Sequence, residues 1–344
     1  MRRLLVAFTA ILLATFVSAS PAYACGGLIG PNGAVNLLRT TTFAGYHDGV
    51  EHYATAFSYA GGGGAFGSLT PLPGIPSSVE RGGDWTLQRL VRETTPIEKR
   101  LLFAAQAAAD GVQILLQTRI DALDITVLKG GGADVGAWAK DHGFRLPPDA
   151  PEALDFYAKR SPIFLAAVFD AAAAAKRGQR LGDGTPVHVT IPTTNPWVPL
   201  HILGLGKLPG ERVEADVFLL TDRRPAMLPM PHRSGALRLE HDAAATATLL
   251  NDLRADKGMA WVPRDAWLTK IRVDAAAGEL SYDLAVDASG QAAPSRVAAG
   301  LDPLLPPLQA EDLSTLWPVA LVGLVYALVV LGFATSRRRL EIAR

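Results

Sequence analysis

VNLLRTTTFAGYHDGVEHYATAFSYA, residues 35–60, is the stretch that decides the character of the fold. Its two halves are rich in β-branched and aromatic residues, which favour extended strands. Asp48-Gly49 between them is a strong signal for a two-residue turn, because both residues tolerate the left-handed backbone that such a turn needs. The stretch therefore predicts a β-hairpin.

Beyond the hairpin, hydrophobic periodicity alternates between the helical and the extended type. The predicted helices are a short one from Asp84, one that starts with a capping box at Thr95 and Glu98, and three over 133–142, 151–160 and 242–257. The predicted strands are 112–120, 122–130, 163–171 and 187–191, a hairpin of 198–205 with 213–220, and a pair of 267–274 with 279–287. Local helices and hairpins of this kind predict an α+β fold with mostly antiparallel sheet.

The C-terminal region holds a long apolar segment. Residues 313–336 read LSTLWPVALVGLVYALVVLGFATS, which is 24 residues without a charge. About 20 residues of helix cover the hydrocarbon core of a bilayer, and helices in a soluble core rarely run so long without a polar face. The segment therefore predicts a transmembrane helix. The tail 337–344 carries four arginines against one acid, which indicates the cytoplasmic side.

The N-terminal residues agree with that orientation. Arg2 and Arg3 precede an apolar run over 4–17, and Ala-Tyr-Ala at 22–24 fits a signal-peptidase site. Residues 1–24 are therefore predicted to be a cleaved signal peptide. A lipoprotein signal is the alternative, because Cys25 would follow the cut, although Tyr23 fits that signal poorly.

Between these ends, residues 25–288 are predicted to form an extracytoplasmic domain, either as one unit or as two lobes divided near residue 185. Residues 289–312 are rich in Ala, Pro and Gly and read as a stalk. Without the signal and the tail, 27 basic and 32 acidic residues leave a net charge of −5. This balance argues against a nucleic-acid partner. Because Cys25 is the only cysteine, an intrachain disulfide and a multi-cysteine zinc site are excluded.

Several blocks of the sequence resemble a bacterial envelope family known as domain of unknown function 2330. They are Cys25-Gly26-Gly27, PLPG at 71–74, ITVLKGGGADVGAWAKDHGFRLPPDAPEALDFYAKR at 125–160, VPLHILGL at 198–205, FLLTDRRP at 218–225 and WLTKIR at 267–272. The resemblance spans most of 25–286. It implies an envelope protein, and it brings no activity, substrate or catalytic residue that can be carried over.

Cys25 is one candidate for chemistry. After signal cleavage it would combine a thiol with a free α-amine, the pairing that N-terminal-nucleophile hydrolases use, in which the amine acts as the base. The alternatives are a disulfide with another chain, lipidation, and an unreactive terminal residue.

His47 and His52 are a second candidate, as metal ligands. If Asp48-Gly49 is a two-residue loop, His47 pairs with Val50, so both histidines share a face diagonally while Glu51 points the other way. Zinc needs at least three protein ligands, and only two are identified. The alternative is a solvated turn, because polar residues gather at hairpin ends.

The sequence contains neither the G-x-S-x-G elbow nor the H-E-x-x-H pair of familiar hydrolases and metalloproteases. It therefore favours a non-enzymatic, single-pass envelope protein without a cofactor, whose N-terminal domain lies outside the cytoplasm. The expected partners are the lipid bilayer and an envelope protein or wall component. The alternatives are an amide hydrolase that uses Cys25 and a metal-binding protein that uses His47 and His52.

Overall fold

The computed structural model describes the part of the chain that precedes the predicted transmembrane segment. The described residues are 27–30, 33–34, 40–57, 66–83, 85–95, 111–112, 117–121, 123–170 and 185–301. They belong to one compact unit that ends at Leu301. The predicted signal peptide, Cys25, the helix after Thr95 and the segments 313–336 and 337–344 lie outside them. Within the described ranges, no helix combines the length and the apolar character needed to cross a membrane.

The predicted hairpin is present and lies inside a large sheet. It consists of β3 (Thr40–His47) and β4 (Val50–Phe57). The sheet has the order β15-β16-β13-β3-β4-β11-β6, and only β13 and β3 pair in parallel. Its other strands are β6 (Ser78–Arg81), β11 (Thr185–Pro192), β13 (Arg212–Thr221), β15 (Leu237–Ala244) and β16 (Trp267–Ala276). This sheet combines strands from both sides of residue 185.

Two further sheets complete the described strands. One has the order β2-β1-β5-β10-β9-β7, with β8 paired to β9, and a small one has the order β12-β17-β14. Their strands are β1 (Gly27–Gly30), β2 (Gly33–Ala34), β5 (Phe66–Pro71), β7 (Gly111–Val112), β8 (Gln117–Ile120), β9 (Leu123–Lys129), β10 (Ile163–Phe169), β12 (Trp197–Val198), β14 (Ala226–Leu228) and β17 (Leu284–Asp287). Most pairs are antiparallel, so the predicted α+β class with mostly antiparallel sheet is confirmed.

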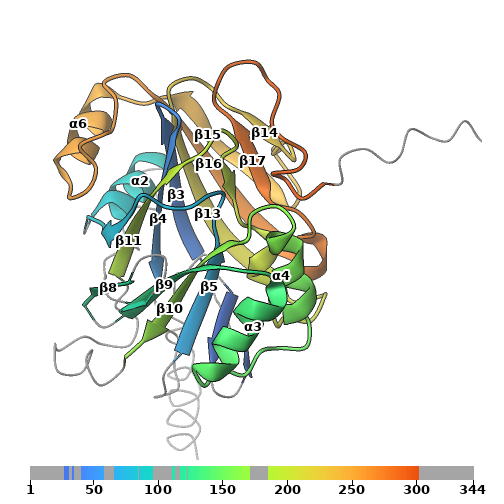
Figure 1. The fold of residues 1–344 in the computed structure, drawn as a ribbon. Coiled ribbons are helices and arrows are strands. Elements are labelled where there is room, and N and C mark those ends of the chain that lie inside the picture. The colour runs from blue at the N-terminus through green and yellow to red at the C-terminus, as the bar shows by residue number, and fades with distance from the viewer. Residues whose placement is uncertain are drawn as a thin grey trace, which may run out of the picture. The chain divides into compact units, whose positions relative to one another are not determined.

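The described helices cover the outer faces of the two large sheets (Figure 1). Helices α2 (Thr86–Thr94) and α6 (Ala247–Ala255) contribute Leu90 and Leu249 to a cluster with Phe43 and Phe218 of the hairpin sheet. Helices α3 (Gly132–Asp141) and α4 (Ala150–Ala158) pack against β5 and β10 through a separate cluster. The order of layers is therefore helices, sheet, sheet, helices.

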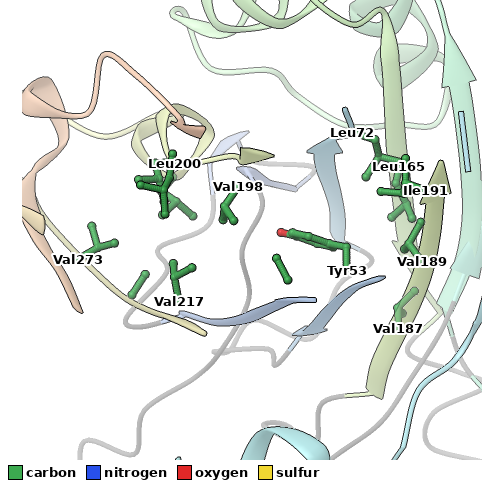
Figure 2. Close-up of a cluster of buried hydrophobic side chains, with 14 of the residues drawn as sticks. Tyr53, Leu72, Leu165, Val187, Val189, Ile191, Val198, Leu200, Val217 and Val273 are labelled. Carbon is green, nitrogen blue, oxygen red and sulfur yellow. The ribbon is translucent and has the colours of Figure 1, made fainter. Parts of the chain in front are cut away.

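The main core fills the space between the two large sheets. Figure 2 shows Leu72 and Leu165 beside Val187, Val189 and Ile191 of β11, and the Tyr53 hydroxyl directed toward Val198. Alternation along the strands produces this arrangement, because successive side chains point to opposite faces. In β13, Val217 points into this core while Phe218 points toward α6.

Two predicted strand pairings were wrong, and one predicted helix begins later than expected. Residues 198–205 do not pair with β13; they form the end of β12 and the 3₁₀ helix η2 (His201–Gly204). The strands at 267–274 and 279–287 do not pair either, because β16 pairs with β13 and β15 while β17 joins the small sheet. The helix expected over 242–257 begins only at Ala247, where the Thr246 side chain accepts a hydrogen bond from Leu249 N–H. Residues before it belong to β15.

The end of the segment 289–301, which the sequence assigns to the start of the stalk, packs against the domain. Ala298 and Ala299 are buried in the cluster under α4, and the carbonyl of Ala299 accepts a hydrogen bond from Asp283 N–H. Small side chains allow this close approach, and the same composition suggested a stalk when only the sequence was considered.

Candidate functional site

The hairpin tip has the predicted geometry. Asp48 and Gly49 have φ values of 49° and 77°, so both occupy the left-handed region that a two-residue turn requires. His47 pairs with Val50, and therefore His47 and His52 lie on the same face, as the register predicts. This much of the candidate metal site is in place.

The two histidines nevertheless have separate partners. His47 Nδ1 lies 2.7 Å from Asp222 Oδ1. His52 Nδ1 lies 3.2 Å from His188 Nε2, and its ring stacks on Trp261 with a centroid separation of 3.8 Å. Among the described residues, no group of three or more His, Cys, Asp or Glu is placed to hold a metal ion. The histidine that the fold brings to His52 is His188 of β11, which the sequence did not connect with it.

Burial governs the chemistry of His52. It lowers the pKa of this imidazole to about 3, with smaller contributions in the same direction from His188 and His47. The ring is therefore neutral at physiological pH. Gly45 makes the stacking possible, since a Cβ at this position would lie 2.1 Å from Cη2 of Trp261.

Glu51, on the opposite face of β4, corrects the expectation of a solvated turn. Asp48 and Gly49 are exposed, but Glu51 is only 1% exposed and neither carboxyl oxygen has a hydrogen-bond partner. Desolvation raises the pKa of Glu51 to about 8. The backbone N–H of Trp197 offsets part of that rise without completing a hydrogen bond. The group is therefore a neutral carboxylic acid at pH 7.

Glu51 lines a small cavity of about 10 Å³. This volume is at the lower limit for one water molecule. The side chains around Glu51 are mostly apolar, and none of the described lining residues is Lys, Arg or His. They are Ala44, Tyr46, Pro196, Trp197, Val198, Leu219, Thr221 and Val286.

A larger cleft, of about 670 Å³, lies beside this cavity. Gly49 of the hairpin tip contributes to it, and so do the segment 192–195 and the segment 295–298. Trp197 lines both the cleft and the Glu51 cavity. Thr193 connects the segment 192–195 to the hairpin, because its N–H donates to Gly49 O and its carbonyl accepts from the Tyr46 hydroxyl at 3.0 Å.

Arg160, two residues after the end of α4, contacts two other residues that line the cleft, Ala298 and Trp197. Its guanidinium donates to Asp283 Oδ2 and to Ala298 O, each at 2.6 Å, and it lies 5.1 Å from the centre of the Trp197 ring. Asp283 is fully buried and also accepts from the Tyr157 hydroxyl. Loss of one partner of a buried ion pair strongly destabilises a protein. We therefore expect this network to hold the cleft wall in place. The Arg160 guanidinium is already bound to Asp283 and Ala298, so it is not a free anion-binding group.

The remaining polar groups of the described cleft lining are uncharged. Hydroxyl groups of Ser161, Thr193, Thr194 and Ser295 and the amide of Asn195 line it. The described lining contains no His, Asp, Glu, Lys or Cys. A nucleophile with an adjacent base is therefore not assembled there, and the donors and acceptors present fit an uncharged polar ligand.

Sequence reasoning identified one edge of this site and missed the rest. It singled out the hairpin tip, which contributes Gly49, but passed over 192–195 and 295–298. The run IPTTNPW at 191–197 carried a signal, because two prolines frame three residues with small polar side chains in an exposed turn. Its neighbour at 295–298 lies about a hundred positions further along the chain, and local patterns do not report that contact.

Comparisons with known proteins identify a family. The sequence model of the family described as uncharacterized protein conserved in bacteria, DUF2330, matches residues 22–287. No curated protein matches the sequence. Among solved structures, a mutated baculovirus P35 after caspase cleavage covers 72% of this chain and 98% of its own, at 9% identity and a TM-score of 0.40. The structure of baculovirus P35 covers 73% of this chain and 95% of its own chain, at 10% identity and a TM-score of 0.37.

Proposed function

The chain belongs to the bacterial family DUF2330, and from that premise we propose that it is a non-enzymatic binding protein of the cell envelope, with its ligand in the cleft between Gly49, 192–195 and 295–298. The observation that carries the proposal is the lining of that cleft, which combines hydroxyl and amide groups, while its described residues include no His, Asp, Glu, Lys or Cys that could activate those hydroxyls. Such a lining recognises an uncharged, hydrogen-bonding ligand, such as a peptide backbone or a sugar.

The cleft is rigid at its base, which favours binding. Arg160 and Asp283 are both well buried, and each makes several hydrogen bonds to different segments. Backbone N–H groups of Leu200 and His201 donate to the same Asp283 oxygen. A preformed wall lowers the ordering cost of association, so affinity does not depend on folding upon binding.

The membrane anchor is part of the same proposal. The 24 uncharged residues 313–336, followed by the basic tail 337–344, support a single span with the binding domain outside the cytoplasm. A removable signal at 1–24 supports the same orientation. The ligand would then be a component of the envelope, either a protein or a wall polymer.

Site-specific photo-crosslinking in intact cells tests the binding role. The full chain is produced with a benzophenone amino acid in place of Asn195, an exposed residue of the cleft, or in place of Thr248, an exposed residue of α6. We expect a discrete adduct with one envelope component from Asn195 and none from Thr248. Equal adducts from the two positions, or no adduct from Asn195 in a folded, envelope-located chain, would overturn the proposal.

A further inference from the structure

Glu51 is a buried ionisable group that, within the described part of the chain, has no hydrogen-bond partner for either side-chain oxygen. Its side chain is almost completely buried, both carboxyl oxygens lack a hydrogen-bond partner, and a cavity of about 10 Å³ lies against it. The neutral acid is tolerated in such a place, but a carboxylate without a partner is not, because its lost hydration is not replaced. Ionisation of Glu51 therefore requires the cavity wall to admit water.

The weakest wall of the cavity also forms the cleft. Pro196, Trp197 and Val198 line the cavity. Trp197 and Val198 form β12, which pairs only with β17 among the described strands. The opposite walls are long strands in the centre of the hairpin sheet. Opening to water is therefore expected on the side of Trp197, which borders the cleft.

Tyr46 connects Glu51 to the cleft by a second route. Tyr46 is the cross-strand partner of Glu51, and its hydroxyl donates to the carbonyl of Thr193. Thr193 N–H in turn donates to Gly49 O at the hairpin tip. A charge at Glu51 acts on Tyr46 directly, and so on the position of the segment 192–195.

The ionisable groups near Glu51 do not neutralise a charge there. Tyr46 of β3 faces Glu51, and Asp222 and Asp287 raise the pKa of this tyrosine. None of these three side chains can carry a positive charge. Tyr53 lies on the same face of β4. β11 presents Ile191 and β13 presents Leu219 and Thr221, none of which is ionisable in this range.

We propose that Glu51 is a proton-operated control of the cleft: with the carboxyl neutral the segment 192–197 stays closed over the cavity and the cleft binds its ligand, and loss of the proton displaces that segment and weakens binding. This control rests on the proposed binding function. Because burial raises the pKa of Glu51 to about 8, the transition falls in the mildly alkaline range.

Nuclear magnetic resonance of the full chain tests the control without a ligand. We expect the amide signals of Thr193, Thr194, Asn195 and Trp197 to shift together with a midpoint near pH 8, and to stay constant between pH 6 and 9.5 in Glu51→Gln. Glu51→Met serves if the glutamine variant does not fold, because it also removes the charge. Constant signals in the unaltered chain, or the same titration in the Glu51 variant, would overturn the proposal.

The connection through Tyr46 has its own test. Tyr46→Phe removes the hydroxyl that binds Thr193 O but leaves Glu51 in place. We expect the pH-dependent shift at Thr193 to fall at least twofold, while the Glu51 amide continues to titrate. An unchanged shift at Thr193 would rule out this hydrogen bond as the route of coupling.

Crosslinking at two pH values separates the control from the binding role. With the photoreactive residue at position 195, we expect the adduct yield to fall at least threefold from pH 7 to pH 9, and to stay level in Glu51→Gln. An equal fall in Glu51→Gln counts against the control. If no adduct forms at either pH, the binding role fails, while the amide titration still decides whether Glu51 moves the segment.

Discussion

Glu51 and His52 are neighbours in the sequence, yet burial shifts their pKa values in opposite senses. The pKa of the Glu51 carboxyl is raised to about 8, and the pKa of the His52 imidazole is lowered to about 3. In both cases burial favours the uncharged form. The register of the hairpin was predictable from Asp48-Gly49, and so was the opposite orientation of these two side chains. Their burial was not, because it depends on Trp261, Trp197 and β11, which lie far along the chain.

The Glu51 carboxyl makes the protein less stable as pH rises. Between about pH 4.5 and 8 the unfolded chain releases this proton while the folded chain keeps it, so stability falls by about 1.4 kcal/mol per pH unit. His52 acts in the opposite sense. Between about pH 6.5 and 3 the unfolded chain binds a proton at this residue and the folded chain does not, so stability falls as the pH falls. The two slopes oppose each other between pH 4.5 and 6.5. Above pH 6.5 only the fall from Glu51 remains.

We therefore expect urea unfolding to show a loss of about 2 kcal/mol from pH 6.5 to 8. In Glu51→Gln that alkaline loss should disappear, whereas Glu152→Gln on the exposed side of α4 should retain it. An alkaline loss of the same size in Glu51→Gln would show that another group causes it.

Gly45 gives a second prediction at the residue scale. A Cβ there would lie 2.1 Å from Cη2 and 2.8 Å from Cζ2 of Trp261, an aromatic ring that cannot bend away. We expect Gly45→Ala to lower the free energy of unfolding by about 1–3 kcal/mol and to disturb the stack on His52. Gly210→Ala is the matched control, since nothing lies within 4 Å of its added methyl group. Equal stability of the two variants would contradict the packing described.

At the scale of elements, local signals succeeded where local contacts decide the structure. The hairpin, α2, α3 and α4 were predicted because turn residues, apolar spacing and Gly143 lie within the elements themselves or next to them. The expected hairpin of 198–205 with 213–220 was wrong because Asp283 binds the backbone N–H groups of Leu200 and His201 and stabilises a 3₁₀ turn. Asp283 is about eighty residues away, and no local pattern connects it with that turn.

The N-terminus of helix α2 also depends on a residue that is distant in the sequence. It has no side-chain cap of its own. Instead Asp256, beyond the end of α6, accepts hydrogen bonds from Thr86 N–H at 2.8 Å and from the Thr86 hydroxyl at 2.6 Å. The carboxylate thus supplies both the acceptor and the negative charge that a helix N-terminus favours.

Asp256→Ala should therefore destabilise the fold by about 1–3 kcal/mol, because it leaves buried donors without an acceptor. Chemical denaturation followed by circular dichroism measures the change. Asp265→Ala, at an exposed position in the loop after α6, should change stability by less than about 0.5 kcal/mol. If Asp256→Ala behaves like this control, the cap contributes nothing to stability.

At the scale of the whole molecule, the order of layers follows from alternating apolar faces, but the pairing of distant strands does not. The sequence predicted an α+β domain between a signal and a span. It did not indicate that β13 lies parallel to β3, or that 295–298 closes one side of the cleft. These contacts join segments with no local sequence relation, and they build the candidate site.

Removing residues 313–344 tests the proposed anchor. The truncated chain should move from the membrane fraction to the soluble extracytoplasmic fraction, because its hydrophobic span is gone. Retention in the membrane would indicate a second anchor. In that case Cys25→Ser in the truncated chain identifies lipidation of Cys25, if the double change releases the protein.

The most direct test of the central claim combines a probe on one wall of the cleft with an obstruction on another. The photoreactive residue replaces Val297, and Thr194→Trp adds bulk at another residue that lines the cleft, with Thr248→Trp on α6 as the control. Our account predicts that the adduct yield from position 297 falls at least fivefold with Thr194→Trp and stays unchanged with Thr248→Trp. A yield that Thr194→Trp leaves intact, or that both variants lower equally, would contradict it.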